Sequence, residues 1–315
     1  ASPFDSIEGR EKVSLFSRLV VTTLPMVPKS LVGRVASRYV AGETLDEAID
    51  EVKKLNGIGA VATMDVLGEE VSVREKAEQA VAEYVHLFEA IESHGLDSNV
   101  SIKPTLLGLK IAEDFCLENI EKIAATAQKF GNFLRIDMED HTCIDGTLRI
   151  YHELQPRYGN LGVVLQTYMR RSLQDIEDLP REGANVRLCK GIYIEPREIA
   201  WKGYQTVRQN FLFCLEKMLD QGVYAAIATH DEFLVCGAVG LLERFQVPHD
   251  HYEFQMLLGV DEQLRQILID GGHRLRVYVP YGPDWYPYSI RRLRENPEVA
   301  VHVARSFLGL SPVNR

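Results

Sequence analysis

The chain has 315 residues, of which 46% are hydrophobic and 25% are charged, and its formal net charge is −10. These proportions are ordinary for a globular protein, and a chain of this length can bury a full core without disulfides or structural metals. An acidic protein has no general electrostatic reason to bind nucleic acid, so we do not expect a nucleic-acid partner.

The five cysteines are scattered along the chain, and none falls in a C-x-x-C pair. This usage argues against a disulfide framework or a zinc site and favours a reducing compartment. No apolar run approaches the about 18 residues that a membrane-spanning helix needs, and the first residues lack the pattern of a signal peptide. We therefore expect a cytoplasmic protein.

The first part of the chain, residues 10–55, is predicted to be helical, with Thr44 as an N-cap before Leu45–Leu55. We assign residues 1–55 to an N-terminal helical extension. Beyond it, short apolar runs rich in β-forming residues alternate with runs of helical period. The predicted strands are Gly59–Met64, Asn99–Lys103, Phe133–Met138, Leu161–Gln166, Asn185–Cys189, Tyr224–Thr229, Tyr252–Met256 and Leu275–Pro280. The predicted helices between them are Val73–Ser93, Glu113–Lys129, Ile144–Gln155, Leu173–Asp178, Glu198–Leu219, Phe233–Phe245 and Glu262–Ile269, followed by a pair from Tyr286 to Phe307.

Short apolar strands that alternate with helices predict parallel βαβ units, and eight such units predict closure into a barrel. The expected fold is therefore of the α/β class, a (β/α)8 TIM barrel over residues 56–315 with extra N-terminal helices. In such barrels the active site lies at the C-terminal ends of the strands. Polar or charged residues recur at nearly all of these ends, in Met64-Asp65, Lys103, Asp137–Asp140, Gln166, Arg187–Lys190, Thr229-His230 and Pro280-Tyr281.

Two of these strand ends allow more than one interpretation. Lys103 could form a Schiff base, bind an anion or simply extend its ammonium group to water. The segment after the third strand places Asp137 and Glu139 near His141, and these residues could hold a divalent metal, pair with cations or cap the next helix. A capping role does not account for Asp137, whose side chain we expect in the barrel mouth.

The fifth strand carries the most specific local pattern, Arg187-Leu188-Cys189-Lys190-Gly191. Arg187 and Lys190 flank the end of the strand, and Gly191 permits a close approach to the backbone. Such a pair of buried cations suits an anion, namely a phosphate, a carboxylate or a reduced flavin.

Four residues of the last predicted helices recur on one helical face: Tyr288, Arg291, Arg292 and Glu295. Glu295 can pair with either arginine and fix its guanidinium group, and fixed arginines suit bidentate binding of a carboxylate. A surface ion-pair ladder would show the same spacing. The aromatic residues just upstream favour instead a pocket for a ring that bears a carboxylate: Tyr281, Trp285 and Tyr286.

Several of these motifs occur together in one known family. The matching segments are Ser101-Ile102-Lys103, Arg187 to Tyr193, Thr229-His230-Asp231, Glu253 to Leu257, and Tyr288-x-x-Arg291-Arg292-Leu293-x-Glu295. In order and spacing they resemble the proline dehydrogenase family, over about residues 61–308. The DNA-binding and aldehyde-dehydrogenase regions of the bifunctional members are not matched, so the chain resembles a monofunctional bacterial form. Cys189 and Asp231 are small departures from the family pattern, which often has valine and asparagine there.

The resemblance implies a distorted (β/α)8 barrel with bound FAD and no metal. It implies the first step of proline catabolism to glutamate, the oxidation of L-proline to Δ1-pyrroline-5-carboxylate by hydride transfer from proline C5 to flavin N5. Electrons would pass to a membrane quinone, so that a cytoplasmic enzyme would work peripherally at the inner membrane. A separate pyrroline-5-carboxylate dehydrogenase would take the product.

Carried over position by position, the resemblance also implies residue roles. Asp137 and Arg187 are the implied catalytic residues, with Asp137 as an anchor for the cations. The proline site would comprise Lys103, Tyr278, Tyr288, Arg291 and Arg292, supported by Glu295 and Leu258. The FAD site would comprise Met138, Gln166, Arg187, Lys190, Gly191, Ile192, Thr229 and His230. Two alternatives stay open: a Schiff-base aldolase that uses Lys103 or Lys190, and a metal-dependent hydrolase that uses Asp137, Glu139 and His141.

Overall fold

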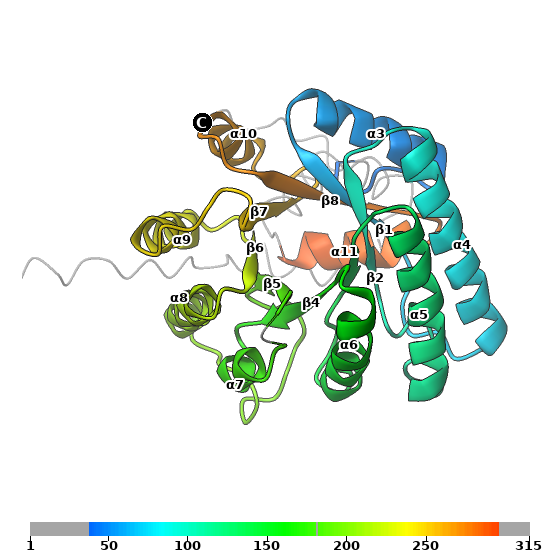
Figure 1. The fold of residues 1–315 in the computed structure, drawn as a ribbon, viewed down its shortest axis with the longest axis horizontal. Helices are drawn as coiled ribbons and strands as arrows, with labels where there is room; N and C mark the ends of the chain where they lie inside the picture. The colour runs from blue at the N-terminus through cyan, green and yellow to red at the C-terminus, as the bar shows by residue number, and fades with distance from the viewer. Residues whose placement is uncertain (1–37, 181, 296–315) are drawn as a thin grey trace, which may run out of the picture. The chain divides into compact units, whose positions relative to one another are not determined.

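The computed structural model describes residues 38–180 and 182–295, with side chains up to residue 290 (Figure 1). Within these residues the chain divides into two compact units. One unit consists of residues 41–282, and the other contains residues 38–40 and 283–295. The second unit contributes one described helix, α11 (Trp285–Glu295).

Residues 41–282 form a closed barrel of eight parallel strands, in which each strand pairs with the next along the chain and β8 pairs with β1. The strands are β1 (Val61–Val66), β2 (Ser98–Ile102), β3 (Leu134–Ile136), β4 (Leu161–Gln166), β5 (Asn185–Cys189), β6 (Tyr224–Ala228), β7 (Tyr252–Leu257) and β8 (Leu275–Tyr281). The helices are α3 (Leu45–Gly57), α4 (Arg74–Ser93), α5 (Glu113–Lys129), α6 (Ile144–Tyr158), α7 (Ser172–Glu177), α8 (Tyr204–Asp220), α9 (Glu232–Arg244) and α10 (Glu262–Asp270). Figure 1 shows these helices around the outside of the sheet. The predicted (β/α)8 barrel is confirmed.

The predicted strands are present, with ends that differ by at most two residues, and β4 and β5 have the predicted bounds. A larger difference concerns helix α8, which the sequence predicts from Glu198 but which begins at Tyr204. The residues just before α8 are not helical, because Ala200, in the connection after β5, forms an antiparallel β-bridge with Met169, in the connection after β4. A backbone that is committed to this bridge cannot continue a helix.

Helix α3 begins where the sequence predicts. The Thr44 hydroxyl accepts the N–H of Glu47, and the Glu47 carboxylate accepts the N–H of Thr44, which together form a capping box. The apolar face of α3 packs in the core of the barrel unit, so this part of the expected extension belongs to residues 41–282. Residues 1–37 lie outside the described residues, and the expected domain boundary at residue 55 stays a prediction.

The two faces of the sheet differ in chemistry. Val186 and Leu188 of β5 are fully buried in the apolar layer between the sheet and the helices. Arg187 lies between them and contacts Ser101 of β2 and Gln255 of β7, although neither strand is a neighbour of β5. Only side chains that point into the barrel can make such contacts. The interior therefore holds charged groups where most barrels of this kind hold valine, isoleucine and leucine.

Arg135 of β3 is one of these interior charges and is only 1% exposed. Its Nη1 donates to the carbonyl oxygens of Val163 and Asn185 at 3.0 and 2.8 Å, and its Nη2 donates to the side-chain oxygen of Asn185. Burial and the nearby Arg187 guanidinium lower the pKa of Arg135 to about 9. Room for the group comes from Gly162 of β4, where a Cβ would lie 2.3 Å from Nη1.

We predict that Gly162→Ala lowers the free energy of unfolding by about 1–3 kcal/mol, because the new methyl group must displace a buried guanidinium or the backbone of β5. Gly240→Ala is a matched control, since Gly240 lies in helix α9 with nothing within 4 Å of the new Cβ. Urea unfolding measures both variants. Equal stability of Gly162→Ala and wild type would contradict the tight packing of Arg135.

Candidate active site

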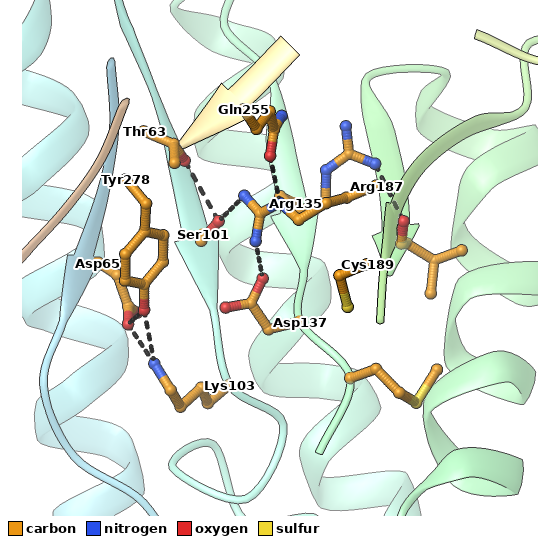
Figure 2. A network of polar contacts seen from close by, with 12 residues as sticks. Thr63, Asp65, Ser101, Lys103, Arg135, Asp137, Arg187, Cys189, Gln255 and Tyr278 are labelled. Carbon is orange, nitrogen blue, oxygen red and sulfur yellow. Dashed lines mark hydrogen bonds and ion pairs between the residues drawn. The ribbon is translucent and has the colours of Figure 1, made fainter. Parts of the chain in front are cut away.

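Arg187 lies in a polar network inside the barrel (Figure 2). Its Nη1 donates to Asp137 at 2.6 Å, its Nη2 to the Ser101 hydroxyl at 2.8 Å and its Nε to the Gln255 side-chain oxygen at 2.5 Å. The ion pair is largely buried, with 10% of the Arg187 side chain and 14% of the Asp137 side chain exposed. A buried pair of this kind is stable only when further hydrogen bonds hold it, as they do here. The structure thus brings together the two residues with implied catalytic roles, and the roles themselves stay predictions.

A second buried ion pair joins Lys103, directly after β2, to Asp65 of β1. Lys103 Nζ donates to Asp65 and, at 3.2 Å, to the Tyr278 hydroxyl, which also donates to Asp65 (Figure 2). Tyr84 of α4 donates to the other oxygen of Asp65 at 3.2 Å. An ammonium group has three N–H donors, and these contacts within the barrel unit use two of them. One donor of Lys103 is therefore available to an anion.

The charge state of Lys103 decides between two hypotheses for this residue, a Schiff-base nucleophile and an anion-binding group. Burial disfavours its charge, but the carboxylates of Asp65 and Asp137 outweigh burial and raise the pKa of Lys103 above its ordinary value. Lys103 is therefore protonated at neutral pH, whereas a Schiff base needs the neutral amine. The geometry favours an anion-binding lysine over an aldolase nucleophile at this position.

Lys190 differs from the expectation of two buried cations at the end of β5. Its side chain is 35% exposed, because β5 ends at Cys189 and Lys190 already belongs to the following connection. Its Nζ donates at 3.2 Å to Asp231, which also accepts two N–H groups of Arg208 from α8. Only Arg187 of the two cations is buried, and each of the two has its own carboxylate partner.

Gly191 is required by two local constraints. Its φ is +103°, a backbone conformation that residues with a side chain rarely adopt, and a Cβ would lie 2.2 Å from the ring of Tyr168. The close approach that we expect at this glycine is thus made by Tyr168, as far as the described residues are concerned. The next residue, Ile192, is 45% exposed, and its expected contact with a cofactor stays a prediction.

Gln166, at the end of β4, has a buried atom without a partner. Its Nε2 donates to the carbonyl oxygen of Met138 at 3.4 Å, whereas its Oε1 has no hydrogen-bond partner among the described residues. Buried acceptors are ordinarily paired, so this one fits a ligand that brings an N–H or O–H donor. The flavin ring of FAD carries such an N–H group, so Gln166 and Met138 fit the expected cofactor site.

Thr229 and His230 follow β6 and both have structural contacts. The Thr229 hydroxyl accepts the N–H of Asp231 at 3.1 Å, and His230 Nε2 accepts the N–H of Leu257 at 2.9 Å. Because Nε2 accepts, the neutral ring carries its proton on Nδ1. Leu258 is buried and donates its N–H to the Tyr278 carbonyl oxygen at 3.1 Å. These contacts order three strand ends around the interior charges.

The three candidates for a metal site face different partners. Asp137 binds the guanidinium described above, and Glu139 accepts the N–H and the hydroxyl of Thr105 at 2.8 and 2.5 Å. His141 Nδ1 lies 2.5 Å from a carboxylate oxygen of Glu195. Among the residues that the structure describes, no group of three His, Cys, Asp or Glu is placed to hold a metal ion. The geometry does not favour a hydrolase built on these residues.

The last helix carries the remaining candidates. Helix α11 spans the positions of Tyr288, Arg291, Arg292 and Glu295, as the sequence predicts. The side chains from residue 291 onward lie outside the described residues, and α11 belongs to the second unit. The expected roles of these four residues stay predictions.

Sequence reasoning missed two residues that hold the candidate site together. Asp65 was visible only as an acid at a strand end, and Gln255 only as part of a matching motif. Their partners, Lys103 and Arg187, are 38 and 68 residues away in the sequence. A signal that could have found Asp65 is the strand register. Once β1 and β2 are known to be neighbours, Asp65 pairs with Ser101, and Ser101 lies two residues before Lys103.

Residues 48–305 match a protein-family model described as proline dehydrogenase. The chain belongs to the proline dehydrogenase family. Proline dehydrogenase 1 of Bacillus subtilis (strain 168) is 36% identical over 273 residues, which cover 87% of this chain and 90% of that protein. The proline dehydrogenase of Deinococcus radiodurans is 37% identical over 279 residues, with the same coverage of 87% and 90%. This coverage is consistent with a monofunctional member of the proline dehydrogenase family.

A larger protein of known structure shares the fold. Proline utilization A from Bdellovibrio bacteriovorus, in a crystal structure of the protein inactivated by N-propargylglycine, superposes with a TM-score of 0.81 at 24% identity. The match covers 90% of this chain and 37% of that chain, and at this identity it concerns the fold alone. Across the described residues of this family member, no helix is long and apolar enough to span a membrane.

Glu139 should make the stability depend on pH. It is 3% exposed, and burial raises its pKa from the ordinary 4.5 to about 7, although the two hydrogen bonds from Thr105 oppose this. The folded protein then keeps a proton that the unfolded chain releases between these two values. In that window the free energy of unfolding falls as pH rises, by up to about 1.4 kcal/mol per pH unit.

Glu139→Gln should lack this component of the pH dependence. Urea unfolding at about pH 5 and pH 7 measures it in both proteins, and the difference between wild type and variant isolates the contribution of Glu139. A wild-type stability that falls no more steeply than that of Glu139→Gln would contradict the raised pKa.

Proposed function

We propose that this member of the proline dehydrogenase family oxidises L-proline to Δ1-pyrroline-5-carboxylate with FAD as its cofactor. The observation that carries the proposal is the pair of neighbouring cations inside the barrel. Lys103, held by Asp65, keeps one N–H donor for a carboxylate, and Arg187 is held separately by Asp137. The relatives named proline dehydrogenase in Bacillus subtilis and Deinococcus radiodurans support the same substrate.

The proposed FAD site is built at the ends of β3 to β6. We assign to it Met138, Gln166, Arg187, Lys190, Gly191, Ile192, Thr229 and His230. Gln166 Oε1, which has no partner among the described residues, and the two cations fit a group that has N–H donors and negative charge. When bound, FAD supplies at flavin N5 the acceptor for the hydride that leaves proline C5. Arg187 supplies a fixed positive charge that is largely buried, where it acts more strongly than in water.

The proposed proline site holds the carboxylate end of the substrate. We assign the carboxylate to Lys103, Arg291 and Arg292, with Glu295 as support for the arginines. Tyr278, Tyr288 and Leu258 would line the ring pocket. Fixing the charged end orients the reactive C5 without any contact to it, which is catalysis by orientation. Because Lys103 stays protonated, it binds the carboxylate but does not take a proton from the proline amine, and we expect proline to react with its amine unprotonated.

We further propose a membrane quinone as the acceptor of the electrons. Since a quinone is dissolved in the bilayer, a cytoplasmic enzyme would dock peripherally at the inner membrane to reach it. In this proposal the product passes to a separate pyrroline-5-carboxylate dehydrogenase.

Anaerobic titration with L-proline tests cofactor and substrate together. We expect the purified protein to absorb near about 450 nm, the region typical of an oxidised flavin, and L-proline to bleach this band. L-alanine, which has the carboxylate and amine but no ring, should leave the band unchanged. A colourless protein that oxidises proline would contradict the flavin, and a flavin band that proline does not bleach would contradict the substrate.

Arg292→Met and Lys103→Met should each raise KM for L-proline roughly ten- to hundredfold, the loss of one charged hydrogen bond to the carboxylate. The flavin content should stay that of wild type. Lys110→Met is the matched control, because Lys110 is an exposed lysine that pairs with Glu70. Lys103→Met also leaves Asp65 without its counter-charge, so Arg292→Met is the cleaner variant. An unchanged KM in Arg292→Met would refute the carboxylate assignment.

A further inference from the structure

A row of buried polar contacts joins Arg187 to the other side of the barrel interior. Arg187 Nε donates to Gln255 Oε1 at 2.5 Å, and Gln255 Nε2 donates to Glu253 Oε1 at 2.5 Å. Glu253 accepts two hydrogen bonds from Arg276 of β8, at 2.7 and 3.0 Å. All four residues are less than a tenth exposed. We call Arg276, Glu253, Gln255 and Arg187 the interior row.

The two neighbours of Gln255 fix the orientation of its amide. A guanidinium group only donates hydrogen bonds, and an ionised carboxylate only accepts them. The Gln255 oxygen must therefore face Arg187 and its NH2 group must face Glu253. Burial favours the neutral form of Glu253, but Arg276 and the hydrogen bond from Gln255 lower the pKa of Glu253 to about 2. Glu253 is therefore ionised at neutral pH and accepts the hydrogen bond from Gln255.

Three side chains each hold one nitrogen atom of Arg187. Gln255 holds Nε, Asp137 holds Nη1 and Ser101 holds Nη2. A guanidinium group has five N–H donors in one plane, so these contacts within the barrel unit leave two of them, both on the Nη atoms. The direction of these two donors follows from the plane of the group, and the Gln255 contact restrains that plane at Nε.

We propose that Gln255 and Glu253 are positioning residues for the oxidation of proline, which act by holding the Arg187 guanidinium in the orientation that the reaction uses. Glu253 orients the Gln255 amide, and Gln255 in turn orients Arg187. The inference rests on the proposed function, in which Arg187 lies beside the cofactor. It requires no contact of Gln255 or Glu253 with substrate or cofactor.

Gln255→Met tests the inference in the flavin-loaded enzyme. Methionine has a similar length but offers no strong acceptor, so Arg187 Nε loses its partner. We expect kcat to fall about tenfold or more, equivalent to about 1.4 kcal/mol in the barrier, and the midpoint potential of the bound flavin to shift. KM for proline should change much less than kcat. Gln155→Met is the matched control, because Gln155 is also buried but lies in α6 and donates to the carbonyl oxygen of Glu182, in the connection before β5.

A double variant separates positioning from a general loss of structure. In an Arg187→Met background, Gln255→Met should change kcat less than about twofold, because residues that act through one another are not additive. An equal fall of kcat in both backgrounds would overturn the proposal. Wild-type kcat and potential in Gln255→Met would overturn it as well.

Gln255→Glu keeps the test decisive if Gln255→Met does not fold. When protonated, the introduced carboxyl group can donate to Glu253 and accept from Arg187, as the amide does. When ionised, it repels Glu253. We therefore expect kcat near the wild-type value at low pH and a fall as pH rises, with an ionisation that wild type lacks. A pH profile of kcat parallel to that of wild type would overturn the proposal.

Failure of the proposed function would look different from failure of this inference. A wild-type protein without flavin, or without reaction with proline, contradicts the proposed function. An active, flavin-containing wild type whose Gln255 variants behave like it contradicts only the positioning roles of Gln255 and Glu253.

Discussion

The burial of charge inside the barrel is the constraint on which the rest of the structure depends. A guanidinium or ammonium group loses its water when it enters a protein and is stable there only with counter-charges or hydrogen bonds around it. Three interior cations meet this condition with one carboxylate each: Arg187 with Asp137, Lys103 with Asp65, and Arg276 with Glu253. The pairs of Lys103 and Arg276 join neighbouring parts of the sheet. Arg187, in contrast, reaches Ser101 of β2 and Gln255 of β7 only across the barrel interior, so its hydrogen bonds depend on the curvature of the whole sheet.

The same constraint determines what the site can do. Each interior cation is fixed by its partners before any ligand arrives, so little reorganisation is needed when a charged ligand binds. The partners do not use every donor, since Lys103 keeps one N–H and Arg187 keeps two within the barrel unit. The neutralised pairs are thus both a folding requirement and the source of the oriented donors that the proposed proline and FAD sites use.

The barrel was predictable from the sequence because its signals are local. Alternating apolar strands and helices identify the βαβ units, and Thr44 marks the start of α3 through a contact only three residues long. The start of α8 was not predictable in this way, because it depends on the bridge between Ala200 and Met169. That bridge joins the connection after β4 to the connection after β5, and no local sequence pattern indicates that these two connections meet.

The candidate site was predictable only in part. Residue types at strand ends identify Lys103, Asp137 and Arg187, and the structure brings all three into one interior. The contacts of Arg187 with Ser101 and Gln255 were not predictable, because Ser101 and Arg187 are 86 residues apart and meet only across the barrel. Lys190 was expected to be buried and is not, since one residue of strand length decides whether a side chain lies inside the barrel or beyond its end.

The fit of Arg135 against Gly162 has a consequence for how such an interior can change over evolutionary time. A Cβ at residue 162 would lie 2.3 Å from the guanidinium of Arg135, and 2.7 Å from both the backbone oxygen of Asn185 and the ring of Phe133. Shortening Arg135 first removes the nearest of these three contacts and leaves the other two. The loss of the arginine therefore lowers the cost of losing the glycine, and this order of replacement is the easier of the two.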